Sequence, residues 1–173
     1  MRSLSALAAA VALSGCALAP GLPKETGGSA FVIEKDLLGE TTARGQFSAI
    51  NGVKRAFTAH LTGTRSGDTF TLAEKFDYDD GEKDQKTWVL TLLGDGKYLG
   101  KREDVVGTAK GWQDGKAFRL SYDVVLPGEN GKEGLKVHFQ DVMVLNGEGA
   151  VINRASVGKF GFQVASVELT IKR

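Results

Sequence analysis

Two kinds of side chain in this sequence could carry chemistry: one thiol and a pair of acids. Cys16 is the only cysteine, and a thiolate is a good nucleophile. Glu74 and Asp141 interrupt otherwise apolar strand faces, and two carboxyl groups at a suitable separation can catalyse glycoside hydrolysis. His60 and His138 fall on the opposite faces of their strands, and no group of acids and histidines has metal-ligand spacing. We therefore expect neither a metal site nor a cofactor.

The residues before Cys16 account for the single thiol. Arg2 is followed by the uncharged run "LSALAAAVAL" (Leu4–Leu13), which has the length of a signal-peptide hydrophobic region and is too short to span a bilayer. The order Leu-Ser-Gly-Cys at 13–16 resembles the lipobox of bacterial lipoproteins, in which the cysteine receives a diacylglycerol and becomes the new amino terminus. The alternative is an ordinary secretory signal that is cleaved after "ALA" at 17–19.

A lipid on Cys16 predicts where the protein is located. Ala17 follows the cysteine instead of an aspartate, which in the enterobacterial sorting rule favours the outer membrane, on its periplasmic side. Two or more acyl chains attach a protein stably to a bilayer. We therefore divide the chain into a signal peptide (1–15), a lipidated cysteine with a flexible tether (16–29) and a folded domain (30–173).

The charge balance of the exported chain limits its partners. The full chain has 22 basic and 21 acidic residues, and the signal peptide removes one basic residue and no acid, so the remaining net charge is zero. A nucleic-acid partner requires a basic excess, and we expect none. The sequence does not identify a protein partner. Because Cys16 has no second cysteine to pair with, the domain has no internal disulfide and depends on its core.

Turn dipeptides punctuate the chain and predict an all-β fold. They are Asn51-Gly52, Ser66-Gly67, Asp80-Gly81, Asp95-Gly96, Asp114-Gly115, Asn130-Gly131 and Asn146-Gly147. Asn-Gly and Asp-Gly favour hairpin turns because both residues tolerate positive φ. We predict an antiparallel up-and-down meander of nine strands over 41–173, with a tenth if residues 31–38 are extended. Closure into a β-barrel would remove the exposed edges, and an open two-sheet sandwich is the alternative.

Alternation along the predicted strands indicates which side chains face the interior. Arg55, Glu74 and Asp141 are charged residues on apolar faces, and an unpaired buried charge is costly. Either the two acids pair across the interior with Arg55 and Arg154, or the charges line a solvated binding cavity. The glycines of the segment 98–112 predict bulges, and this segment contributes Tyr98 and Asp104 to the candidate site. The candidate ligand-binding residues are Arg55, Glu74, Trp88, Tyr98, Asp104, Tyr122, Asp141 and Arg154.

Several blocks of the sequence resemble a known family. They are "ARGQF" (Ala43–Phe47), "LAEKFDYDDGEKDQKTWVL" (Leu72–Leu90), "YLGKREDVVGTAKG" (Tyr98–Gly111) and "NRASVGKFG" (Asn153–Gly161). With the lipobox, they resemble a bacterial lipoprotein family catalogued as domain of unknown function 3833. The sequence departs from the family pattern at Arg102, where a small residue is expected, and at Val142, where a tryptophan is expected. The resemblance implies a lipocalin-like barrel. Members are often encoded near fatty-acid-modifying enzymes, which favours a lipid ligand.

These observations predict a membrane-anchored envelope lipoprotein whose barrel binds a small hydrophobic or amphiphilic ligand, such as a fatty acid or another lipid. We expect that it is not an enzyme. The alternative is a non-enzymatic envelope adaptor or structural lipoprotein, and a hydrolase that uses Glu74 and Asp141 is a third hypothesis. No serine lies in a strand-to-helix elbow, and lipidation would consume the Cys16 thiol, so no catalytic nucleophile is expected.

Overall fold

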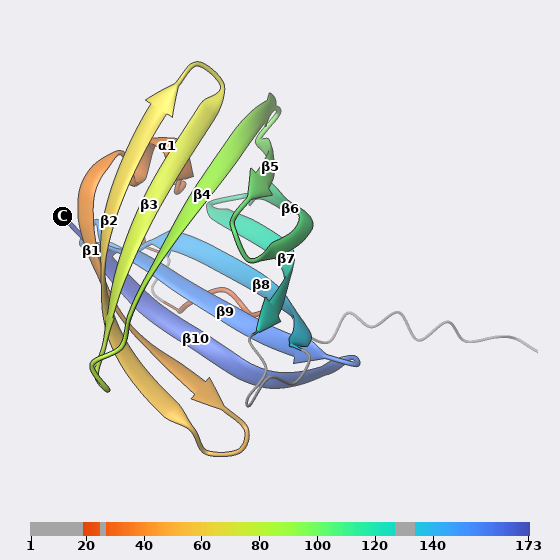
Figure 1. Ribbon diagram of the computed structural model, residues 1–173. Coiled ribbons are helices and arrows are strands. Elements are labelled where there is room, and N and C mark those ends of the chain that lie inside the picture. Colours follow the sequence, from red (N-terminus) through yellow and green to blue (C-terminus); the bar gives the residue numbers. More distant parts are fainter. Residues whose placement is uncertain (1–18, 25–26, 127–133) are drawn as a thin grey trace, which may run out of the picture.

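The protein folds as an antiparallel β-barrel (Figure 1). The computed structural model describes residues 19–24, 27–126 and 134–173, so Cys16 and the signal peptide lie outside the described residues. The elements are α1 (Ile33–Asp36), β1 (Gly39–Ala49), β2 (Lys54–Ser66), β3 (Thr69–Tyr78), β4 (Lys83–Gly94), β5 (Lys97–Lys101), β6 (Val105–Asp114), β7 (Ala117–Leu126), β8 (Leu135–Leu145), β9 (Val151–Lys159) and β10 (Phe162–Lys172). In this described part, no helix is both long and apolar enough to cross a bilayer.

The strands form the closed up-and-down meander that the turn dipeptides predict. Each strand pairs antiparallel with its neighbours in sequence, and β1 closes the barrel by pairing with β10. The closing register runs from Thr42 opposite Lys172 to Ala49 opposite Ala165. Because the sheet joins itself, the open-sandwich alternative is excluded and the barrel has no free edge.

The tenth strand, which the sequence analysis allowed if residues 31–38 were extended, does not come from these residues. These residues include the short helix α1. The tenth strand arises because the chain turns at 102–104 and divides the segment 98–112 between β5 and β6. The predicted irregularity is present: the register of β6 against β7 shifts between Val106 and Lys110, where Gly107 has a φ of 75°.

Helix α1 closes one end of the barrel, which we call the plugged end. This end also carries the β2–β3, β4–β5, β6–β7 and β8–β9 turns. Phe31, Ile33 and Leu37 are buried in the core, and the Phe31 N–H donates to the Lys116 carbonyl oxygen at 3.0 Å. A Cβ on Gly63 would lie 1.9 Å from the Leu37 carbonyl oxygen, so the close approach of α1 to β2 requires glycine.

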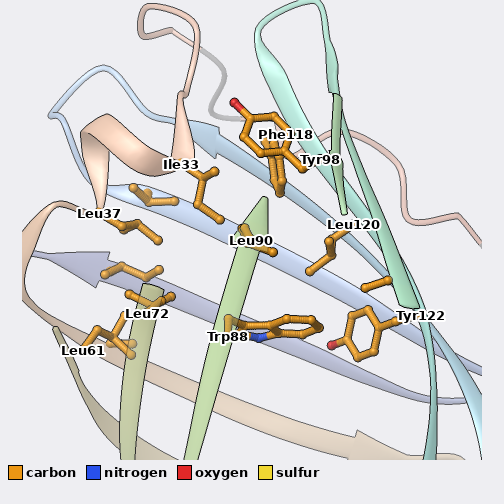
Figure 2. Close-up of a cluster of buried hydrophobic side chains, with 14 of the residues drawn as sticks. Ile33, Leu37, Leu61, Leu72, Trp88, Leu90, Tyr98, Phe118, Leu120 and Tyr122 are labelled. Carbon is orange, nitrogen blue, oxygen red and sulfur yellow. The ribbon is translucent and has the colours of Figure 1, made fainter. Parts of the chain in front are cut away.

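The apolar core fills the barrel below this helix. Figure 2 shows Ile33 and Leu37 facing Leu61, Leu72 and Leu90, which come from β2, β3 and β4. Tyr98 and Phe118 make an edge-on ring contact with centroids 5.1 Å apart. Leu72 in β3, Leu90 in β4 and Phe118 in β7 occupy the alternate positions at which strand alternation predicts inward-facing side chains. The core therefore rigidly supports the inner wall on which the candidate site lies.

The described residues before α1 contact the outside of the barrel. Arg119 Nη1 donates to the Pro20 carbonyl oxygen at 3.3 Å, and Lys116 Nζ donates to the Gly28 carbonyl oxygen at 3.0 Å. Val142, at one of the two departures from the family pattern, points outward and is fully buried in a small cluster with Ala117 and Val144. The division of the chain at residues 15 and 29 stays a prediction.

Candidate ligand-binding site inside the barrel

Partly exposed aromatic side chains line the end of the barrel opposite α1, which we call the mouth. It carries the β1–β2, β3–β4, β5–β6 and β9–β10 turns. Phe47, Phe57, Phe76 and Tyr78 face inward by strand alternation, and each is half-buried. Phe57 lies edge-on to Phe76 with ring centroids 5.7 Å apart, and Phe76 stacks on Tyr78 at 6.1 Å. Since these rings are on the inner face, their partial exposure shows that solvent reaches the inner wall at the mouth.

Arg55 lies at the mouth and does not reach the interior acids. Its guanidinium carbon is 3.6 Å from the centroid of the Tyr78 ring. It pairs with Asp80 at 2.6 Å and with Glu82 at 2.5 Å, and both acids are exposed on the β3–β4 turn. The alternative in which Arg55 pairs with Glu74 and Asp141 was therefore wrong. Arg55 lies at the mouth end of β2, where the exposed acids of the β3–β4 turn bind it instead.

Deeper in the barrel, five residues form what we call the interior polar cluster: Glu74, Arg102, Tyr122, Asp141 and Asn153. Asn153 Nδ2 donates to Asp141 Oδ1 at 3.1 Å. Three buried oxygens of the cluster have no hydrogen-bond partner among the residues that the structure describes: Glu74 Oε2, Asp141 Oδ2 and Asn153 Oδ1. A buried polar atom without a partner costs about 1–3 kcal/mol, so these oxygens call for a water or a ligand that donates hydrogen bonds to them.

Burial raises the pKa values of both acids of the cluster toward neutral pH. It raises the pKa of Glu74 to about 7, although the positive charge of Arg102 opposes the rise. Burial also raises the pKa of Asp141 to about 6, against the Asn153 amide and the Tyr122 hydroxyl, which favour the carboxylate. The pKa of Tyr122 lies well above its ordinary value because of burial and of the charge on Asp141, so its hydroxyl remains protonated. The cluster can thus exchange protons near pH 7.

Arg102 links these acids to an aromatic wall. Its Nε lies 2.7 Å from Asp104 Oδ1, and its guanidinium carbon is 4.6 Å from the centroid of Trp88. The rings of Trp88 and Tyr122 lie edge-on with centroids 5.0 Å apart. Figure 2 shows the two side chains next to each other. Burial acts to lower the pKa of Arg102, but Tyr122 and Asp104 raise it above its ordinary value, so the guanidinium stays charged. A cation and its carboxylate partner therefore border the two titrating acids.

The structure brings together five of the eight predicted residues in or beside the interior polar cluster: Glu74, Trp88, Asp104, Tyr122 and Asp141. Tyr98 lies at the plugged end, where its hydroxyl donates to Glu34 Oε2 at 2.9 Å and where burial and this bond raise its pKa to about 12. Arg154 lies on the outer face, 3.3 Å from Glu168 Oε1. Its predicted pairing with the interior acids was therefore wrong.

Sequence reasoning missed two members of the cluster. Strand alternation could have found Asn153, because Val151, Ala155 and Val157 are inward and buried at the same parity, which places Arg154 outside. Arg102 lies in the β5–β6 turn, where alternation does not apply. Its departure from the family pattern was the remaining signal.

The chemistry open to this cluster is proton exchange and the binding of hydrogen-bond donors. Among the residues that the structure describes, no three His, Cys, Asp or Glu side chains are arranged to hold a metal ion. A pocket of about 450 Å³ beside Glu34 and Tyr98 lies at the plugged end, away from the cluster.

Comparisons with known proteins add a family and a fold. The sequence matches the family described as "Protein of unknown function (DUF3833)" over residues 10–173. None of the curated proteins compared with it matches. The structure is similar to the S-type phycobiliprotein lyase CPES from Guillardia theta, with a TM-score of 0.60 and 10% identity over 82% of this chain and 90% of that chain. A candidate AttH from Nitrosomonas europaea has a TM-score of 0.28 and 13% identity over 87% of this chain and 56% of that chain, and it supports no structural argument.

The likeness to the lyase supports the lipocalin-like barrel and corrects one expectation. The sequence analysis predicted a protein that is not an enzyme. A similar barrel occurs in a protein named a lyase, and this finding contradicts that prediction. At this level of identity the likeness shows the fold alone, so the reaction of the lyase is not transferred to this chain.

Proposed function

The chain belongs to the family described as proteins of unknown function (DUF3833), and we propose that it is an envelope lipoprotein whose barrel binds a small amphiphilic molecule. The apolar part of the ligand would contact the aromatic rings of the mouth, and its polar group would reach the interior polar cluster. One observation carries the proposal: three unpartnered buried oxygens lie on the inner wall of a barrel whose mouth is aromatic and half-exposed.

The unpartnered atoms favour a polar group that donates hydrogen bonds. All three are acceptors when Glu74 and Asp141 are charged. A fatty-acid carboxylate would add a third negative charge beside them, and Arg102 is already paired with Asp104. An amine, amide or hydroxyl group would instead donate to the free oxygens, and such bonds are strongest to a charged acceptor. A lipid with an amine or hydroxyl head group therefore fits better than a free fatty acid.

Mass spectrometry can test this proposal directly. The full-length chain with Cys16→Ser, which cannot be lipidated at that position, would be purified from cells and examined under native conditions. We expect a bound lipid of defined mass, and we expect the double variant Glu74→Gln and Asp141→Asn to reduce its occupancy by about tenfold or more, since hydrogen bonds to charged groups contribute about 1.5–3 kcal/mol.

The matched control is Glu168→Gln, because Glu168 is an exposed acid whose partner Arg154 is on the outer face. This variant should retain the ligand. An empty protein that accepts nothing from a lipid extract would contradict the proposal, and so would unchanged occupancy in the double variant.

The membrane anchor rests on the sequence before and at Cys16 and has its own test. Leu13, Ser14 and Gly15 precede the cysteine, and Ala17 after it favours the outer membrane. Radiolabelled palmitate should be incorporated into the natural chain and not into the Cys16→Ser variant. Continued labelling of the variant would refute lipidation at this residue.

A hydrolase that uses Glu74 and Asp141 is the second candidate function. The observation that favours it is the pair of pKa values, about 7 and about 6, which lie near the pH at which general acids and bases work best. Glycosidase substrates would be screened with the natural chain and with each amide variant. A hydrolysis rate that both Glu74→Gln and Asp141→Asn leave unchanged would exclude this role.

A further inference from the structure

Four exposed apolar side chains project from two neighbouring turns at the mouth. Ile50 and Val53 flank the β1–β2 turn and are 77% and 52% exposed, and Phe160 and Phe162 flank the β9–β10 turn and are 88% and 75% exposed. The bases of the two turns are joined, because the Ile50 N–H donates to the Val164 carbonyl oxygen at 3.0 Å. In Figure 1 the first turn is at the bottom of the barrel and the second at its right edge. We call these four side chains the mouth patch.

The backbone at Phe160 shows that folding does not favour this residue. Lys159 pairs with Phe162, so the hairpin has a two-residue loop, in which Phe160 has a φ of 50° and Gly161 a φ of 83°. Such a loop prefers asparagine, aspartate or glycine at its first position, and a bulky residue with positive φ is a strained exception. The same chain follows the rule in its β4–β5 turn, where Asp95 has a φ of 50°. Phe160 therefore combines backbone strain with near-complete exposure.

The charges around the mouth patch indicate what it contacts. Residues 49–56 and 158–165 contain Lys54, Arg55 and Lys159 and no acid. Arg55 is already paired with Asp80 and Glu82 of the β3–β4 turn, so Lys54 and Lys159 are the cations left beside the mouth patch. Lys159 Nζ lies 4.8 Å from the centroid of the Phe160 ring. Exposed aromatic rings with adjacent cations suit the surface of an anionic bilayer, where the rings enter the boundary between head groups and acyl chains and the ammonium groups meet phosphates.

We infer that the mouth patch docks the barrel onto an anionic phospholipid bilayer, with the mouth turned toward the lipid. This inference goes beyond the proposed function, because docking requires neither a ligand in the barrel nor a lipid on Cys16. It gives the barrel a second membrane contact, formed by side chains of the folded domain. The aromatic inner wall at the mouth would then open toward the source of an amphiphile.

Vesicle sedimentation tests the docking surface. The full-length chain with Cys16→Ser would be mixed with two kinds of vesicle. One contains phosphatidylcholine alone, and the other also contains about 30% phosphatidylglycerol, an anionic lipid that makes the vesicle surface negative. We expect binding to the anionic vesicles, and we expect Phe160→Ser with Phe162→Ser to weaken it by about tenfold or more, since each ring would lose its apolar burial. The control replaces Leu93 and Leu99 with serine; these residues are 55% and 40% exposed near the plugged end. It should change binding by less than about twofold.

A fluorescence experiment locates the contact without removing the patch. Phe160→Trp should be quenched by phospholipids with brominated acyl chains, and Leu93→Trp should not. Equal quenching of the two variants, or no binding to anionic vesicles, would overturn the inference. A concentration-dependent dimer that is lost in the Phe160→Ser and Phe162→Ser variant would assign the patch to a second copy of the chain. Ligand occupancy measured by native mass spectrometry is independent of these results, so docking and ligand binding can fail separately.

Discussion

Replacing Glu74 with glutamine should stabilise the protein above pH 7 and have a much smaller effect near pH 5. Burial raises the pKa of the Glu74 carboxyl group from 4.5 to about 7. Between these two values the folded protein retains a proton that the unfolded chain has released. The free energy of unfolding therefore falls as the pH rises through this window and is constant above it. A pKa shift of this size corresponds to roughly 3 kcal/mol that the charged carboxylate costs the folded state at pH 8.

Glutamine keeps the shape of Glu74 and cannot ionise, so it removes this cost but still buries a polar group. We expect a net gain of about 1–3 kcal/mol at pH 8. Urea unfolding of the full-length chain with Cys16→Ser, followed by tryptophan fluorescence at pH 5 and pH 8, measures the gain. The control is Glu40→Gln, an exposed acid at the start of β1, which should leave the pH dependence unchanged.

The reasoning is refuted if the natural chain and the Glu74→Gln variant lose the same stability between pH 5 and pH 8. Asp141, whose burial raises its pKa to about 6, contributes in the same direction. Its charge is among the causes that raise the pKa of Glu74. Adding Asp141→Asn should therefore flatten the pH profile further by less than its separate effect, because the two titrations are coupled.

Three further substitutions test the two ends of the barrel. Tyr98→Phe removes the hydroxyl that donates to the buried Glu34 at 2.9 Å and should lower the urea-measured stability by about 1–3 kcal/mol. Gly63→Ala places a Cβ 1.9 Å from a carbonyl oxygen of the plugged end and should cost roughly 1–3 kcal/mol, with faster amide hydrogen exchange in α1. Phe160→Asn should raise stability by about 1 kcal/mol, because asparagine tolerates positive φ, while it weakens vesicle binding.

The order of the strands was predictable because the turn residues act locally. Asp95-Gly96 adopts the positive φ values that its composition predicts, and the antiparallel neighbours follow from a short hairpin. Helix α1 could not be predicted in the same way. It has four residues, too few for an independently stable helix, and its conformation is held by burial of Phe31, Ile33 and Leu37 against the barrel.

The candidate site was predictable in part, for a geometric reason. Alternation assigns a residue to the inner or outer face but does not give its depth along the barrel. Glu74 and Asp141 are on the inner face, as expected, and lie deep in the barrel, whereas Arg55 is inward at a strand end and pairs with acids at the rim. Arg102 was inaccessible to this reasoning, because a turn has no alternating faces. Its guanidinium reaches the interior from the mouth.

The two features that disfavour folding lie on the same side of the plug. The unpartnered oxygens of Glu74, Asp141 and Asn153 face the barrel interior, and Phe160 is strained and exposed at its mouth. At the plugged end the buried Glu34 accepts a hydrogen bond from a tyrosine, whereas Thr41 Oγ1, near the start of β1, is buried without a partner among the described residues. Unsatisfied groups are therefore not confined to one end of the barrel, but three of the four gather in the interior polar cluster. A cluster of this kind is expected if a lipid-like molecule passes across the aromatic rings of the mouth to the acids inside.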